Sequence, residues 1–172
     1  MEMDILKLST DWAKAEVFSA KMVTLLSVLF FLIAFGFWQF GKTAMAKAFV
    51  WPLLVVGVLV IAIAAGLYFT NKPRILSFET AYRSDPDQFI QSEIARSAKS
   101  QKDLATIVFK VLPATIIVAA LLIMFFSTPL WRAIGITIIV FMACLMFIDS
   151  NTAERNANYH QQLVDLKQWE TK

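Results

Sequence analysis

The chain has 172 residues, of which 58% are hydrophobic and 17% charged, and its formal net charge is +3. Soluble domains are roughly 45–50% hydrophobic, and a soluble fold of this length cannot bury so much apolar surface, so we expect a lipid bilayer to solvate part of it. A single cysteine excludes an internal disulfide and multi-cysteine metal sites, and we expect no metal ion or cofactor. The small net charge gives no indication of a nucleic-acid partner.

The first apolar run begins at Met22, after a segment of mixed charge that covers residues 1–21. A secretory signal peptide has a basic region before its apolar core, whereas this segment mixes acidic residues with lysines. We therefore expect residues 1–21 to be retained as a cytoplasmic or interfacial segment, with a short helix that starts near Thr10 or Asp11. The apolar residues of that helix are Trp12, Val17 and Phe18.

Four apolar runs are candidates to cross a bilayer, which takes about 20 residues. They cover residues 22–41, 48–71, 111–130 and 131–148. The fourth run is the shortest, and it spans if Arg132 extends to the headgroups and Trp131 lies at the interface; the alternative is a half-buried core helix. The short connections 41–48 and 127–132 predict two helical hairpins. The predicted fold is thus an all-α integral membrane protein, an up-down bundle of four transmembrane helices with helical cytoplasmic extensions.

Lysine and arginine are distributed unequally between the two ends of this bundle. Residues 1–21, 72–110 and 149–172 share one side and contain three, seven and three of the 16 basic residues, and the other side has only Lys42, Lys47 and Arg132. Basic residues favour the cytoplasmic side of a membrane. We therefore expect both termini and the central segment to be cytoplasmic, as in a multi-pass protein of a bacterial cytoplasmic membrane.

The central segment, residues 72–110, contains the start signal of a helix. Asp85 suits the N-cap, Pro86 the first helical position and Gln88 the capping-box position. No glycine or proline follows until Pro113. We therefore predict one helix from about Pro86 that continues into the third span and bends at Pro113, where the proline removes a backbone donor.

The tail, residues 149–172, also favours helix and has a narrow apolar stripe. We predict that it packs antiparallel against the helix that begins near Pro86, and that this helix pair is the most promising partner surface. The alternative is a disordered tail that touches nothing. The apolar residues expected to meet are Phe89, Ile90, Ile94, Tyr159, Leu163 and Leu166.

Residues Gly36–Thr43 match the P-loop pattern G-x-x-x-x-G-K-[ST]. A P-loop follows a strand and needs a flexible turn, but here a predicted transmembrane helix precedes a stretch of bulky aromatic residues. The expected topology also places Lys42 and Asp149, which mimics a Walker B aspartate, in opposite compartments. We therefore expect no nucleotide binding. No other catalytic pattern is recognisable, and we expect the only histidine, His160, to be a solvated surface residue.

The second span and the residues after it have competing interpretations. Ala62 and Gly66 form a small-xxx-small pair, which suits packing within the bundle or self-association, and we favour packing within the bundle. Lys72 and Arg74, in the turn-like stretch Asn71–Arg74, suit contacts with anionic headgroups. The alternative, which we favour, is that they belong to the ordinary cytoplasmic basic cluster.

These patterns favour a non-catalytic membrane protein: a subunit, accessory or regulatory component that acts through its cytoplasmic helices on a protein partner or a second copy. Apart from Arg132 at the start of the fourth run, the spans lack the acidic and basic residues that mark ion paths. An oligomeric channel or small transporter is the alternative. A lipid-acting membrane enzyme is a third option. Its candidate polar residues are Arg74, Glu79, Tyr82 and Arg83.

Overall fold

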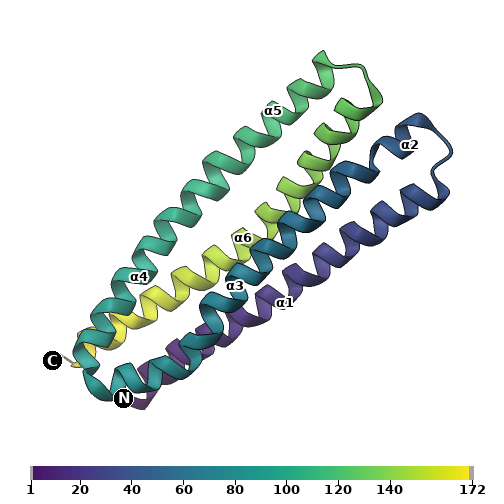
Figure 1. The fold of residues 1–172 in the computed structure, drawn as a ribbon. Helices are drawn as coiled ribbons and strands as arrows, with labels where there is room; N and C mark the ends of the chain where they lie inside the picture. Colours follow the sequence, from purple (N-terminus) through teal and green to yellow (C-terminus); the bar gives the residue numbers. More distant parts are fainter. Residues whose placement is uncertain (1, 171–172) are drawn as a thin grey trace.

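The chain folds into long helices. The computed structural model describes the backbone of residues 2–170 and the side chains of residues 5–168, and there is no strand within this range. The elements are α1 (Glu2–Phe40), α2 (Ala44–Ala48), α3 (Val50–Ser84), α4 (Pro86–Thr106), the π-helical segment η1 (Ile107–Val111), α5 (Leu112–Phe125) and α6 (Pro129–Glu170) (Figure 1). The expected all-helical fold is confirmed for these residues.

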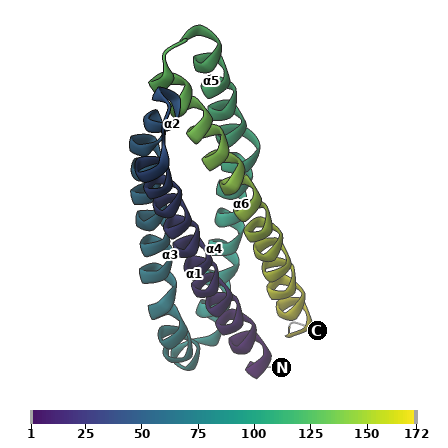
Figure 2. The ribbon, with the colours of Figure 1, turned by 90° about the vertical axis from the view of Figure 1, so that its right-hand side faces the viewer.

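The helices form two hairpins that meet most fully at one end. Both termini and the α3–α4 turn lie at that end, and the two short connections lie at the other (Figure 1, Figure 2). We call the first the polar end and define it as residues 2–20, 72–106 and 149–168; the apolar part is residues 21–71 and 107–148. In the apolar part α1 packs along α3 and α5 packs along α6, whereas α5 hardly touches α1 or α3.

Four helical segments are long and apolar enough to cross a membrane: Ile5–Phe40, Ala44–Ser84, Pro86–Phe125 and Pro129–Gln168. Large hydrophobic side chains cover the outside of the apolar part, where leaving each in water costs about 1.5–3 kcal/mol. This surface is consistent with a multi-pass membrane protein. Its most exposed residues include Phe40, Trp51, Phe69, Met124, Phe125 and Phe147.

Helix α1 begins much earlier than the sequence indicates, at Glu2 rather than near Thr10, and it is continuous with the first apolar run. The reason is a buried stripe that recurs every three or four residues along its whole length. Because three members of that stripe are polar, hydrophobic periodicity alone does not reveal it. The stripe comprises Ile5, Ser9, Ala13, Glu16, Ala20, Val23, Ser27, Phe30 and Ala34.

The expected turn at Asn71–Arg74 is wrong, because α3 continues through Pro73 to Ser84. An internal proline costs a helix about 3 kcal/mol. The extension carries Phe78 and Tyr82 into the core of the polar end, where they are 6% and 8% exposed. Burying two such side chains contributes about 1.5–3 kcal/mol each, enough to offset the proline.

The predicted helix from Pro86 into the third span is confirmed. Asp85 Oδ1 accepts a hydrogen bond of 2.9 Å from the Gln88 amide, and Pro86 occupies the first helical position. The helix runs without a loop to Phe125, and its irregularity is η1, which ends two residues before Pro113. At the end of η1 the Leu112 amide donates to the Ile107 carbonyl, so the hydrogen-bond ladder is locally widened near the proline, which lacks a donor.

In each hairpin, a glycine lies where the two helices pack closely against each other. A Cβ at Gly57 of α3 would lie 2.8 Å from the Phe31 ring of α1, and one at Gly135 of α6 would lie 3.0 Å from the Ala119 carbonyl of α5. In contrast, nothing lies within 4 Å of the Cβ position of Gly66, and Ala62 is exposed. The expectation that Ala62 and Gly66 pack within the bundle is therefore wrong.

Candidate functional site

At the polar end, all four long helices contribute to one hydrophobic core. The expected packing between α4 and α6 is present, with Leu163 fully buried. Helices α1 and α3 add Ile5, Trp12, Phe78 and Tyr82, so the unit contains four helices rather than a helix pair. The six residues expected at a partner surface belong to this core or its edge. Phe89, Ile90, Tyr159 and Leu163 are buried, and Ile94 and Leu166 are partly buried against them.

A charged pair lies inside this end of the bundle. Arg96 donates from Nε to Glu93 Oε1 at 2.9 Å and from Nη2 to Glu93 Oε2 at 2.6 Å. The Glu93 side chain is only 6% exposed. This two-point geometry satisfies both carboxylate oxygens, as burial of a charge requires.

Tyr159 of α6 completes the coordination of Glu93. Its hydroxyl lies 2.6 Å from Glu93 Oε2 and 2.9 Å from Ser9 Oγ. A phenol has one proton, so Tyr159 donates to the carboxylate and Ser9 is the donor in the other contact. Burial, reinforced by the negative charge of Glu93, raises the pKa of Tyr159 well above its usual range.

Aromatic rings cover the same charged pair. The Arg96 guanidinium carbon lies 3.9 Å from the centre of the Trp12 ring, and Trp12 stacks on Tyr159 with ring centres 5.2 Å apart. A cation over an aromatic face gains about 0.5–2 kcal/mol, most where water is excluded. Helices α1, α4 and α6 are thereby joined at one point.

Further polar contacts connect α6 to its neighbours. Arg155 Nη2 donates to Glu16 Oε1 at 2.6 Å. Asn156 Nδ2 donates to the Ser97 carbonyl at 3.1 Å, and Ser97 Oγ lies 2.7 Å from His160 Nδ1. His160 is half-buried, so the expectation of a solvated surface histidine is wrong.

The contact between Ser97 and His160 resembles a nucleophile next to a base, which requires that a substrate reach the hydroxyl. Ser97 is fully buried and also lies 3.0 Å from the Ile94 carbonyl, which it can serve as a donor. The contact therefore joins α4 to α6 rather than presenting a reactive hydroxyl. Among residues 5–168, no three histidine, cysteine, aspartate or glutamate side chains are grouped closely enough to hold a metal ion.

Two open grooves flank the charged core. One, of about 410 Å³, lies between α1 and α6 and includes Asp11, Trp12, Arg155 and Asn158. The other, of about 480 Å³, lies mainly between α3 and α4 and includes Arg74 and Lys99. Both grooves expose charged side chains next to the polar core, where a ligand can reach them.

The two residues expected to contact headgroups differ in position. Lys72 Nζ donates to the Tyr68 hydroxyl at 2.6 Å on the exposed face of α3. Arg74 is half-buried, and its Nη1 donates to Asn71 Oδ1 at 2.8 Å beside the α3–α4 groove. Sequence spacing alone cannot distinguish the two, because their separation depends on α3 remaining helical through Pro73.

The candidate residues for a lipid-acting enzyme do not converge. Arg83 Nη2 donates to Glu79 Oε1 at 2.6 Å in an exposed pair. Tyr82 is buried in the hydrophobic core, where its ring packs edge-on against Phe89. Arg74 belongs to the groove instead. The four residues thus lie in three separate places and do not form one site.

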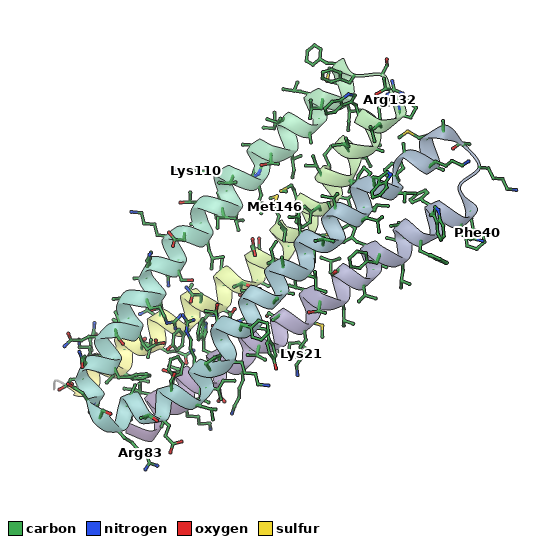
Figure 3. All side chains as sticks on the ribbon, in the orientation of Figure 1. Lys21, Phe40, Arg83, Lys110, Arg132 and Met146 are labelled. Atoms are coloured by element: carbon green, nitrogen blue, oxygen red, sulfur yellow. The ribbon has the colours of Figure 1, made fainter. Side chains whose placement is uncertain are left out.

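The P-loop match lacks the required geometry. Helix α1 continues through Phe40 where a strand and a flexible turn are needed, and Thr43 Oγ1 accepts from the Ala46 amide at 3.1 Å as the N-cap of α2. Figure 3 places Phe40 and Arg132 on different hairpins at the same end of the molecule, and Met146 toward the middle. Lys42 comes two residues after Phe40, and Asp149 comes three residues after Met146. The two halves of the apparent motif therefore lie far apart.

Comparison of the chain with protein-family models, with curated proteins and with solved structures finds no match. The class of the protein is defined by its fold alone, which is helical with four helices long and apolar enough to cross a membrane.

Proposed function

We propose that the chain is a multi-pass membrane protein with both termini in the cytoplasm, and that it is a non-catalytic subunit, accessory or regulatory component. Four apolar helices with lipid-like outer surfaces support the membrane location. The excess of lysine and arginine in the polar end supports the orientation. In this proposal, the polar end is a preformed cytoplasmic platform that a protein partner recognises.

The observation that carries this proposal is that the buried charges of the polar end bind one another. Glu93 is held by Arg96 and Tyr159, and Glu16 is held by Arg155. A buried ion pair adds little net stability, and in this proposal its role is to fix one arrangement of the helices. The polar end would then be a platform of fixed shape. The side chains that a partner recognises would surround the groove between α1 and α6.

Photo-crosslinking in native membranes tests this function. A photoreactive amino acid replaces Asn158, on the groove between α1 and α6, or Lys47, an exposed residue at the opposite end of the bundle. We expect one discrete protein adduct from position 158 and none from position 47. Adducts that are only self-crosslinks or lipid at both positions would contradict the platform.

An oligomeric channel is the second candidate, and one observation favours it. Because α5 hardly touches α1 or α3, apolar faces remain uncovered between the hairpins, where another copy can pack. Ion flux in proteoliposomes that contain the purified chain, with a native-size oligomer, would favour this function over the platform.

A further inference from the structure

We propose that the groove between α3 and α4 binds an anionic phospholipid, with the phosphate among its basic side chains and an acyl chain along its apolar wall. This inference rests on the proposed membrane location. It assigns a ligand to a second groove of the platform, separate from the groove between α1 and α6 that the partner is proposed to recognise.

The groove has two chemically distinct ends. The basic part of the groove includes Arg74, Lys99 and Ser100. The apolar part of the groove includes Gly66, Leu67 and Ile107. Gly66 and Leu67 belong to the uncharged run that ends at Asn71, and Arg74 lies one helical turn further along α3. A groove that changes from apolar to basic at this depth matches the division between acyl chain and headgroup.

Its cationic groups are available to a ligand. Arg96, which also lines the groove, is neutralised by Glu93, and Glu16 is neutralised by Arg155. Among the described residues, no carboxylate lies within ion-pair distance of Arg74 or Lys99. These two cations face one remaining carboxylate in the lining, that of Asp103, so the groove is left with a positive excess.

Arg74 is held in place before any ligand arrives. The Asn71 side chain is buried, donates from Nδ2 to the Leu67 carbonyl at 2.9 Å and accepts the guanidinium of Arg74 through Oδ1. Burial and the nearby positive charge of Arg96 lower the pKa of Arg74. A phosphate oxygen in the groove would accept from this guanidinium and favour its charged form, as paired charges do.

The apolar wall is open where a chain must enter. A Cβ at Gly66 would meet nothing within 4 Å, and α5 hardly touches α3 in the apolar part. The opposite wall includes Ile107, the first residue of the π-helical segment, and such segments are frequent at functional sites. An acyl chain therefore has room beside Gly66, between the two hairpins.

Native mass spectrometry of the full chain in detergent measures this binding. The titrants are phosphatidylglycerol, phosphatidylcholine with the same acyl chains, and inorganic phosphate. We expect one phosphatidylglycerol to bind at least tenfold more tightly than phosphatidylcholine, and inorganic phosphate not to displace it. Equal affinity for both lipids would overturn the proposal, and displacement by millimolar phosphate would indicate a free-anion site instead.

The variants separate this site from general electrostatics. Arg74→Gln with Lys99→Gln should weaken phosphatidylglycerol binding at least tenfold, whereas Lys72→Gln, on the other face of α3, should change it less than twofold. Equal loss in both variants would overturn the proposal. Gly66→Leu extends a side chain from an open Cβ position into the apolar wall, and we expect it to weaken lipid binding without lowering the unfolding temperature. A chain that extracts from membranes without detergent refutes the proposed function; a membrane-inserted chain without lipid preference refutes only this inference.

Discussion

The guanidinium carbon of Arg96 lies 3.9 Å from the centre of the Trp12 ring, and this contact joins α4 to α1 inside the polar end. The arginine is held there by Glu93, which is itself held by Tyr159 from α6. Three helices thus depend on one carboxylate. Removing the Glu93 carboxylate should therefore lower the stability of the protein far more than removing a carboxylate on the surface.

Glu93→Gln should destabilise the protein by about 3 kcal/mol, because it leaves Arg96 partly buried without its counter-charge. Glu79→Gln is the matched control, since it breaks the exposed pair with Arg83 and should cost less than about 1 kcal/mol. Unfolding in detergent followed by circular dichroism measures both values. Similar costs for the two variants would show that the Glu93 pair is not buried in solution.

The phenol of Tyr159 should make the polar end sensitive to alkaline pH. Its folded-state pKa is raised by burial and by Glu93, whereas an unfolded tyrosine titrates near its usual value of about 10. The stabilisation is therefore complete below pH of about 10 and is lost as the pH rises toward the raised value. Unfolding temperatures of wild type and Tyr159→Phe between pH 8 and pH 11 test this.

Over that range, wild type should lose stability more steeply with pH than Tyr159→Phe. The substitution itself should lower stability at pH 8 by about 1–2 kcal/mol, because Glu93 loses a charge-assisted hydrogen bond. Parallel pH profiles for the two proteins would contradict the burial of the phenol.

Gly135→Ala should destabilise the α5–α6 hairpin by about 1–3 kcal/mol, because the new methyl group meets Ile123 and the Ala119 carbonyl. Gly66→Ala is the control, since its methyl group enters open space. Thermal unfolding of each variant in the same detergent compares them. A larger cost at Gly66 than at Gly135 would mean that the helices pack differently from this arrangement.

Local signals in the sequence predict the long helix from Pro86 to the third span, because Asp85, Pro86 and Gln88 act within one turn. They do not predict the start of α1 or the passage of α3 through Pro73. Both depend on burial against distant helices, which outweighs the local preference.

Hydrophobic periodicity alone does not predict the charged core. Glu16 and Glu93 lie on mixed polar stretches and have the composition of solvated residues. Only the tertiary fold brings Arg155 and Tyr159 of α6 to them. The alternation of buried Ser9 and Glu16 with apolar residues in α1 was the one available signal, and it requires counting polar residues as members of a helix face.

Labelling of single cysteines in intact cells tests the central claim, the four-span topology with a cytoplasmic polar end, most directly. In a Cys144→Ala background, Thr43→Cys and Ser84→Cys place a thiol at exposed positions at opposite ends of the bundle. We expect a membrane-impermeant maleimide to label position 43 in intact cells and position 84 only after the membrane is opened. Labelling of position 84 but not position 43 in intact cells would contradict the orientation, and labelling of both would contradict a membrane between them.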